Sequence, residues 1–182
     1  IVGKLTEKFS GTIIVATPTF LRSYMRRCTP EQFKTLDAVV AGAERLPPEL
    51  CNEYEAKFGV RPVEGYGATE LSPITSVNIP PSRQFGGKFQ VDCKEGTVGR
   101  PMANIAAKIL HLDTGEELGA NEAGMLWIKG PNVMKGYLDN PEATAEVIVD
   151  GWYKTGDVAL IDEDGFVKIT GRMSRFSKIG GE

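Results

Sequence analysis

The stretch Thr12-Ile13-Ile14-Val15-Ala16-Thr17-Pro18 decides the fold class of this chain. Its short apolar run predicts a buried β-strand. Thr17 then offers a helix N-cap and Pro18 a first-turn proline, so we expect a helix to begin directly after the strand. Strands that alternate with amphipathic helices are typical of parallel α/β layers.

The same alternation continues downstream. We expect strands at residues 36–42 and 60–65, with a helix at 48–58 that Gly59 ends. Polar and glycine-containing segments follow two of these strands: residues 42–44 follow one and residues 66–70 follow the next. Ligands of open parallel sheets bind at the edge where the strands end, which makes both segments candidates for binding.

From about residue 96 the pattern changes to short strands joined by tight turns, which predicts a small antiparallel sheet or distorted barrel. The expected strands are residues 104–112, 124–130, 158–162 and 166–170, and the expected hairpin turns are residues 113–115 and 162–165.

Four parts are therefore expected along the chain. They are an α/β sheet portion (1–80), a loop or linker (81–95), an antiparallel β subdomain (96–170), and a hinge with the start of a C-terminal domain (171–182).

Composition and charge exclude several classes of function and structure. The chain has 182 residues, 21 Lys and Arg against 24 Asp and Glu, and a net charge of -3, so it carries no basic footprint for nucleic acid. Three cysteines without paired spacing predict neither a disulfide framework nor a zinc cluster. No apolar run approaches the roughly 20 residues of a membrane span. We expect a cytoplasmic protein, and membrane association of a longer parent stays open.

Three separated segments carry the candidate chemistry: Gly65-Tyr66-Gly67-Ala68-Thr69-Glu70, Tyr153-Lys154-Thr155-Gly156-Asp157 and Gly171-Arg172. Together they predict one nucleotide site that holds adenine, phosphate with a metal, and a ribose diol. The ring face of Tyr66 can stack on adenine, and Gly65 and Gly67 remove side chains that would block a flat base.

The charged residues have matching roles. Glu70 is a hard oxygen ligand suited to magnesium. A turn-borne Asp157 can accept two hydrogen bonds from a ribose diol, and Arg172 can donate to ribose or phosphate. Each also has a structural interpretation, because Glu70 alone fits a solvated cap, Asp157 a turn aspartate and Arg172 a surface arginine.

In their order and amino-acid sequence, six segments resemble the adenylate-forming superfamily. This superfamily includes acyl-CoA synthetases, acyl-carrier-protein synthetases, peptide-synthetase adenylation domains and firefly luciferases. The segments are Ala41 to Pro47, Gly65 to Pro73, Gly96 to Pro101, Lys129 to Leu138, Gly151 to Asp157 and Gly171 to Glu182. The resemblance implies the C-terminal portion of an α/β large domain, in which a parallel βαβ piece precedes a small antiparallel distorted β-barrel.

The resemblance also implies roles for individual residues. Thr69 would hydrogen-bond the α-phosphate of ATP and Glu70 would bind Mg²⁺. The turn of Gly42, Ala43 and Glu44 would cover the other face of adenine through its backbone. Lys178 matches a catalytic lysine that follows the family's hinge, although Arg175 departs from the Asp or Lys of many members at the hinge position.

The implied activity is that of an ATP-dependent ligase. The parent would convert a fatty acid and ATP to acyl-AMP and pass the acyl group to coenzyme A or to the phosphopantetheine thiol of an acyl-carrier protein. Residues 171–182 are similar to the acyl-carrier-protein synthetase half of bifunctional enzymes that also carry a 2-acylglycerophosphoethanolamine acyltransferase. An amino- or aryl-acid adenylation domain and a non-catalytic nucleotide-binding module stay open as alternatives.

Members of the superfamily are much longer than this chain, which begins without Met and contains no glycine-rich phosphate loop. We therefore expect an excised, inactive piece whose uncovered apolar faces could produce an artefactual dimer. The lone His111 and the segment 162–165 are expected to be structural, the latter as a β-turn rather than a calcium loop.

Overall fold

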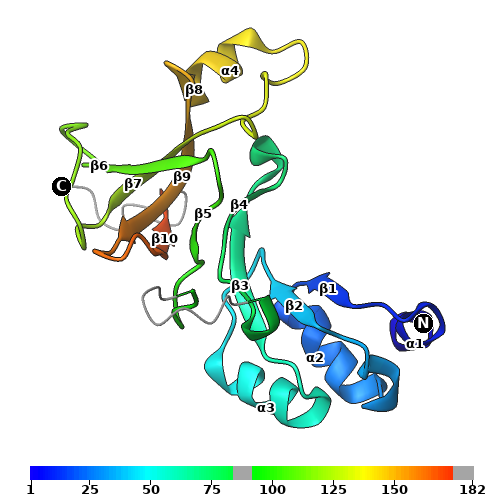
Figure 1. The fold of residues 1–182 in the computed structure, drawn as a ribbon. Helices are drawn as coiled ribbons and strands as arrows, with labels where there is room; N and C mark the ends of the chain where they lie inside the picture. Colours follow the sequence, from blue (N-terminus) through cyan, green and yellow to red (C-terminus); the bar gives the residue numbers. More distant parts are fainter. Residues whose placement is uncertain (84–91, 174–182) are drawn as a thin grey trace, which may run out of the picture. The chain divides into compact units, whose positions relative to one another are not determined.

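The computed structural model describes residues 1–83 and 92–173. They form two compact units (Figure 1). Unit 1 comprises Ile1–Tyr66 and Val77–Gly99, and unit 2 comprises Gly67–Ser76 and the chain from Arg100 onward. Residues 84–91 of the expected linker, and residues 174–182 with Lys178 and Arg175, lie outside the described part of the chain.

Unit 1 contains the parallel strands that the sequence predicts. β1 (Ile13–Ala16) pairs with β2 (Ala38–Ala41), and β2 pairs with β3 (Pro62–Gly67), all in parallel. Val39 lies opposite Ile14 and Pro62 in the two ladders. Two further strands, β4 (Ile74–Val77) and β5 (Arg100–Pro101), lie almost entirely in unit 2. The parallel α/β prediction is confirmed.

The start of α2 and both ends of α3 lie where the sequence signals place them. α2 (Pro18–Arg27) is capped by the Thr17 hydroxyl, which accepts a hydrogen bond from the Phe20 N–H at 3.4 Å. α3 (Pro48–Phe58) ends at Gly59, whose φ of 74° lies in the left-handed region that glycine tolerates. The described part of the unit also contains the short helices α1 (Val2–Phe9), η1 (Glu31–Phe33) and η3 (Pro81–Arg83).

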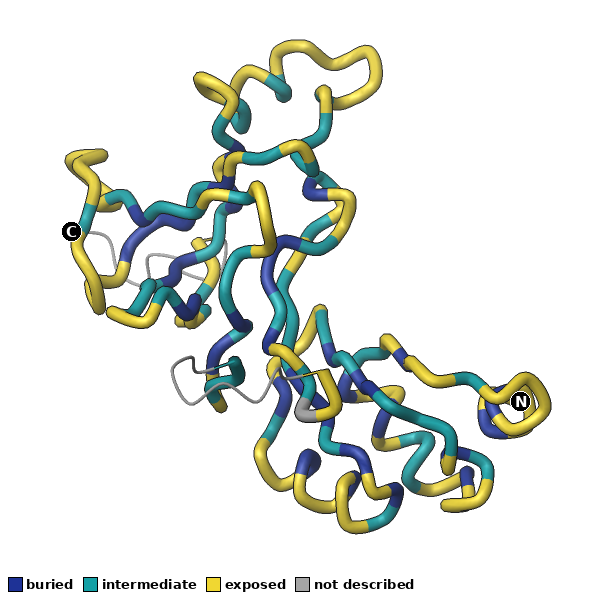
Figure 2. The backbone as a smooth tube through the Cα atoms, in the orientation of Figure 1, coloured by how far each residue is buried: buried dark blue, intermediate teal, exposed yellow. Residues whose placement is uncertain are grey.

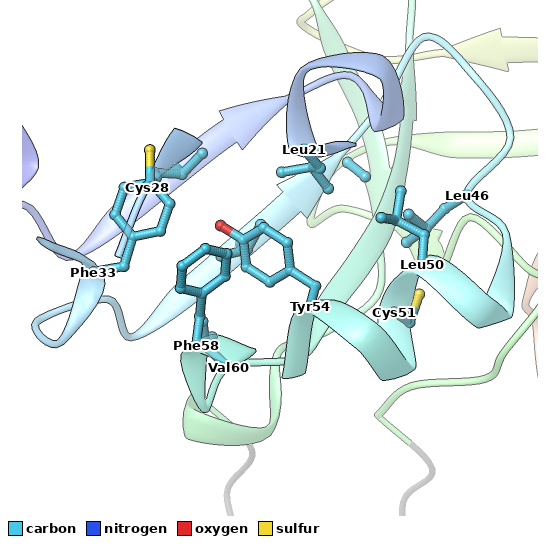
Figure 3. Close-up of a cluster of buried hydrophobic side chains, with 12 residues drawn as sticks. Leu21, Cys28, Phe33, Leu46, Leu50, Cys51, Tyr54, Phe58 and Val60 are labelled. Atoms are coloured by element: carbon cyan, nitrogen blue, oxygen red, sulfur yellow. The ribbon is translucent and has the colours of Figure 1, made fainter. Parts of the chain in front are cut away.

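The core of unit 1 lies between the strands and these helices (Figure 3). Tyr54 and Phe58 of α3 have ring centroids 4.7 Å apart, and Phe58 lies 4.9 Å from Phe33, which is fully buried. The labelled members are Leu21, Cys28, Phe33, Leu46, Leu50, Cys51, Tyr54, Phe58 and Val60. Aromatic contacts of this kind contribute beyond the area that they bury.

Only one face of β1 is covered within the described residues. Ile14 joins the core, whereas Ile13 and Val15 on the other face are exposed (Figure 2). The predicted buried strand is therefore confirmed for the face that carries Ile14 and wrong for the face that carries Ile13 and Val15. Because side chains alternate between the two faces of a strand, the apolar run could not distinguish burial on one face from burial on both.

Unit 2 is built around an antiparallel sheet with strand order β10-β9-β7-β6, and β8 pairs with β9. This curled sheet confirms the antiparallel prediction. The strands are β6 (Ala106–Leu110), β7 (Gly124–Lys129), β8 (Ile148–Val149), β9 (Trp152–Ile161) and β10 (Val167–Arg172), and the unit also holds η2 (Thr69–Leu71) and α4 (Pro141–Val147).

Two features of unit 2 differ from the sequence prediction. β9 begins at Trp152 rather than at residue 158, so it includes the Tyr153–Asp157 motif. α4 was not predicted, because it buries none of its residues and so has no apolar periodicity to reveal it. Within the described residues, every helix is too short or too polar to cross a membrane.

Candidate functional site

The unit 1 candidates lie where β2 and β3 end. The Gly42 N–H donates to the Ala16 carbonyl at 3.2 Å, which continues the β1–β2 ladder by one residue. A Cβ atom placed at Gly42 would be 3.5 Å from the Gly65 carbonyl oxygen, so the backbones of the two strand ends lie side by side. Ala43 follows with a φ of 67°, an uncommon conformation for a residue with a side chain.

Glu44 ties this turn to the start of α2. Its Oε2 atom accepts hydrogen bonds from the Thr19 hydroxyl at 2.8 Å and from the Thr19 N–H at 3.3 Å. A carboxylate at a helix N-terminus is also stabilised by the helix dipole. Glu44 therefore holds the turn by its side chain.

Glu64, which sequence reasoning missed, supports the same region. Its Oε1 atom accepts the Leu46 N–H at 3.2 Å, and burial raises the pKa of its carboxyl. Tyr66 comes two residues later and is half-buried. Glu64 sits in a strand beside the quoted motif, yet no pattern in the sequence indicated that it braces the loop after β2.

The unit 2 candidates begin in the turn after β3. The Ala68 N–H donates to the Pro73 carbonyl at 2.9 Å, and the Leu71 N–H donates to the Ala68 carbonyl at 2.9 Å. A Cβ atom at Gly67 would overlap the Pro73 carbonyl. The hairpin itself therefore requires glycine at this position, which is a reason independent of any bound base.

Two contacts hold Glu70 in this turn, and a third holds the residue after it. Its carbonyl accepts the Met134 N–H at 2.8 Å, and its Oε1 atom accepts the Tyr137 hydroxyl at 2.8 Å. The Asn132 amide donates to the Leu71 carbonyl next in the chain at 3.0 Å. Thr69, in contrast, is exposed. The segment from Asn132 to Tyr137 thus fixes both the backbone and the carboxylate of Glu70.

Two tyrosines extend the contact beyond Glu70. The Tyr137 and Tyr153 hydroxyls lie near enough for each to affect the pKa of the other. The hydrogen bond to the Glu70 carboxylate raises the pKa of Tyr137. Burial, and then the negative charge of Glu70, raise the pKa of Tyr153, and Asp157 adds to this effect. Neither hydroxyl had an expected role, because no local pattern joins residues so distant in sequence.

Asp157 lies inside β9, which corrects the expectation of a turn-borne aspartate. Gly156 before it has a φ of 76°, and the Asp157 N–H donates to the Thr155 hydroxyl at 3.1 Å. That hydroxyl donates to the Leu126 carbonyl of β7 at 2.9 Å. The strand therefore stays paired through its irregularity, because Thr155 bridges the two strands with its side chain.

Arg172 lies directly opposite Asp157 in the β9–β10 register, and its Nε atom is 3.4 Å from the Asp157 carboxylate. A register shift between Ile169 and Gly171 produces this alignment. The Asp157 side chain is 16% exposed and that of Arg172 is 63% exposed. A sheltered carboxylate beside an exposed guanidinium can present acceptors and donors to one small polar ligand.

The structure therefore gathers Glu70, Asp157 and Arg172, with Tyr137 and Tyr153, in unit 2. The backbones of Gly42 and Gly65, with Glu44, belong to unit 1, and Lys178 lies outside the described residues. His111 Nδ1 accepts the Thr114 N–H at 3.2 Å, and Asp162 Oδ1 accepts the Phe166 N–H at 2.9 Å in the turn predicted at residues 162–165.

The donor set around Glu70 suits a magnesium ion that is shared with a phosphate ligand. Across residues 1–83 and 92–173, no three His, Cys, Asp or Glu side chains cluster as a metal cage would require. Mg²⁺ is commonly bound by one or two carboxylates together with phosphate oxygens and waters. A single carboxylate whose position is fixed by a hydroxyl fits that arrangement.

Comparison with known proteins identifies similar sequences and structures. The family described as "AMP-binding enzyme" matches residues 2–138. The long-chain-fatty-acid–CoA ligase of Salmonella typhimurium is 41% identical over 180 residues, which cover 98% of this chain and 30% of the relative. The chain thus spans less than a third of the length of such curated relatives.

Two solved structures are similar over nearly the whole chain. A long-chain-fatty-acid-CoA ligase from Archaeoglobus fulgidus has a TM-score of 0.76 and 31% identity, and the match covers 93% of this chain and 36% of that one. The O-succinylbenzoate coenzyme A synthetase of Bacillus subtilis, in complex with AMP, has a TM-score of 0.77 and 29% identity, over 98% and 34% of the two chains.

Proposed function

We propose that this chain, which belongs to the family of AMP-binding enzymes, is part of an ATP-dependent ligase. The full-length ligase would activate a fatty acid and transfer it to a thiol. One observation carries this proposal: Glu70, Asp157 and Arg172 lie in one unit, each held in place by neighbouring side chains or strands. The fatty-acid substrate class is supported by the names of the similar ligases from Salmonella and Archaeoglobus.

The reaction has two steps. First, a carboxylate oxygen of the acid attacks the α-phosphorus of ATP, which forms the acyl–AMP bond and releases pyrophosphate. Second, the thiol sulfur attacks the acyl carbon, which forms a thioester and releases AMP, while the thiol proton passes to solvent. Both steps place negative charge near the phosphates, so fixed positive and hydrogen-bonding groups lower the barrier.

The described residues have distinct roles in this scheme. Thr69 hydrogen-bonds the α-phosphate, and Glu70 binds Mg²⁺, which when bound neutralises charge on the ATP phosphates. Asp157 accepts the two hydroxyls of the ribose, and Arg172 donates to ribose or phosphate. Asp157 can do so because β9 and β10 hold it beside Arg172 and largely out of water.

The adenine contacts are assigned to glycines and one aromatic ring. One face of adenine contacts the backbone of residues 42–44. The ring of Tyr66 stacks on the other face, and the flanking glycines, Gly65 and Gly67, have no side chain to block the base. Lys178 keeps its proposed catalytic role from the family resemblance.

The thiol acceptor is proposed to be coenzyme A or an acyl-carrier protein. Coenzyme A is supported by the names of the ligases above. The acyl-carrier protein, and with it a bifunctional parent that handles phospholipid, rests on the likeness of residues 171–182 alone. An aryl acid is the second candidate substrate, because the similar structure from Bacillus subtilis is named an O-succinylbenzoate synthetase.

The test is pyrophosphate release by the full-length protein with MgATP and a panel of fatty, aryl and amino acids. We expect release to be stimulated selectively by fatty acids. Asp157→Ala should lower kcat/KM for ATP by about 10- to 100-fold, because it removes hydrogen bonds to a charged acceptor. Asp113→Ala, which changes an exposed turn aspartate in the same unit, is the matched control.

Each outcome separates the candidates. Stimulation by aryl acids alone moves the substrate assignment to the second candidate. No release with any acid by a folded protein that binds ATP rejects the ligase and favours a nucleotide-binding module. Replacing coenzyme A with a phosphopantetheinylated carrier protein in the same assay then identifies the acceptor.

A further inference from the structure

We propose that Tyr137 is a positioning residue for the ligase reaction: its hydroxyl holds the Glu70 carboxylate in the orientation that binds the metal of MgATP, and Tyr153 orients Tyr137 in turn. The inference rests on the proposed function for the identity of the nucleotide. It assigns a role to two hydroxyl groups on elements far from Glu70 in sequence.

The first support is the direct contact. The Tyr137 hydroxyl lies 2.8 Å from Glu70 Oε1, a normal distance for a hydrogen bond between two oxygens. An ionised carboxylate can only accept, so the phenol must be the donor. One oxygen of Glu70 is therefore oriented by the protein, and rotation of the carboxylate would break this bond.

The second support is that Tyr137 is itself held in place. The Tyr137 N–H donates to the Thr144 hydroxyl of α4 at 2.9 Å. Gly136 has a φ of 151°, and a Cβ atom there would come within 2.9 Å of the Thr144 side chain. Thr144 is in turn bonded to the Asn140 carbonyl at 2.9 Å. The exposed helix α4 thus has a definite task, which is to fix the backbone that carries Tyr137.

The third support is the link to β9. Tyr153 is only 5% exposed, and burial, then the nearby Glu70 carboxylate and Tyr137, raise the pKa of its hydroxyl. Because Tyr137 donates to Glu70, its oxygen is free to accept from Tyr153. Tyr153 lies four residues before Asp157 on the same strand. The proposed metal ligand and the proposed ribose ligand are therefore connected through Tyr137, Tyr153 and β9.

The expected size of the effect follows from other metal sites. Residues that hydrogen-bond a metal ligand without touching the metal commonly change metal affinity or activity by about 10- to 100-fold when they are replaced. Tyr137→Phe removes only the hydroxyl and keeps the ring. Tyr137 is 38% exposed, so this change leaves the buried core intact.

The experiment measures Mn²⁺ binding to the full-length protein in the presence of ATP, by electron paramagnetic resonance of the free ion. Tyr137→Phe should weaken Mn²⁺ binding by about 10- to 100-fold. Tyr153→Phe should have a smaller effect of the same sign, because its hydroxyl reaches Glu70 only through Tyr137. Tyr24→Phe applies the same substitution in unit 1 and should leave the affinity unchanged.

A double-mutant cycle distinguishes positioning from general damage. Glu70→Gln should weaken Mn²⁺ binding most, and adding Tyr137→Phe to it should have no further effect, because the carboxylate that Tyr137 orients is gone. In turnover assays, the Mg²⁺ concentration that gives half the maximal rate should rise in Tyr137→Phe by the same factor as the Mn²⁺ affinity falls. A purely structural role would give additive losses and an unchanged Mg²⁺ dependence.

Mn²⁺ affinity in Tyr137→Phe within twofold of the unmodified protein would overturn the inference, as would unchanged affinity in Glu70→Gln. Both results leave the ligase assignment standing if acyl-AMP still forms. Absence of acyl-AMP in the unmodified protein rejects the proposed function instead, even where the Mn²⁺ difference persists. If Tyr137→Phe loses its native circular dichroism, Tyr153→Phe carries the same test alone.

Discussion

In unit 1 the proposed nucleotide contacts are mostly backbone, whereas in unit 2 they are carboxylate, hydroxyl and guanidinium groups. Gly42 and Gly65 bring two strand ends together without side chains, and Glu44 turns its carboxylate toward Thr19. In unit 2, Glu70 and Asp157 are oriented by Tyr137 and Arg172. The contacts of unit 1 therefore depend on the core that shapes its backbone, and those of unit 2 depend on individual functional groups.

The largest expected effect tests the dependence of unit 1 on its core. Phe33→Ala should lower the free energy of unfolding of unit 1 by about 3–5 kcal/mol, because it empties a fully buried ring site. Phe20→Ala is the matched control: Phe20 also contacts Tyr24 but is 56% exposed, so its loss should be below about 1 kcal/mol. Hydrogen exchange of unit 1 peptides in the full-length protein measures both.

Similar losses in Phe33→Ala and Phe20→Ala would break the comparison, because they would show that burial does not set the stability of unit 1. Phe33→Ala would sharpen the comparison between the two units if it loses ATP affinity only at temperatures where unit 1 unfolds and regains it where the unit is folded. That result would show that the core acts on the contacts only by keeping the backbone in place.

The second prediction compares a helix in each unit. The Thr17 hydroxyl caps α2, and the Asn140 side chain caps α4 by accepting the Ala143 N–H at 3.1 Å. Replacing either residue by alanine should remove about 1 kcal/mol of helix stability. α2 buries Leu21 and unfolds with its unit, whereas α4 buries no residue and should open by itself.

Hydrogen exchange separates the two cases. Asn140→Ala should speed exchange only in peptides near residues 140–147, and Thr17→Ala should affect peptides throughout unit 1. Because α4 holds the Tyr137 backbone through Thr144, Asn140→Ala should also raise the Mg²⁺ requirement of turnover slightly. Exchange that spreads through unit 2 in Asn140→Ala would contradict the independence of α4.

The accuracy of the sequence predictions follows the same division. The bounds of α3 and the start of α2 were predictable, because Thr17, Pro18 and Gly59 act on the residues next to them. The antiparallel character of the later strands was predictable from their turns, such as the one at Gly115, which has a φ of 72°. Local signals suffice where the physical cause is also local.

The candidate site shows what local signals leave out. Motif likeness indicated Glu70, Asp157 and Arg172, but not that β9 would extend through Asp157, because Lys154 and Gly156 interrupt its apolar pattern. Nothing near Glu70 in sequence indicates Tyr137, since the contact arises from the path of the chain after β7. The pairing of Asp157 with Arg172 likewise depends on a register shift that alternation alone would not predict.

The smallest expected effect on stability comes from the two arginine ion pairs. Arg61 in unit 1 donates to Glu55 at 2.7 Å and to Glu95, and these carboxylates raise its pKa, whereas Arg172 in unit 2 pairs with Asp157 at 3.4 Å. Exposed ion pairs contribute about 0.2–1 kcal/mol each. Arg61→Ala should thus lower the stability of unit 1 by about 1 kcal/mol, and Arg172→Ala should lower that of unit 2 by less.

The order should reverse for function, which is why the arginine pair sharpens the comparison most. Arg61 braces α3 against Glu95 within unit 1, so its loss should leave the KM for ATP unchanged once the protein is folded. Arg172 flanks the proposed ribose ligand, so its loss should raise the KM for ATP several-fold with little change in unfolding. Equal KM values in the two variants would mean that Arg172 is only a surface partner of Asp157. The contrast between backbone contacts in unit 1 and charged contacts in unit 2 would then rest on Glu70 and Asp157 alone.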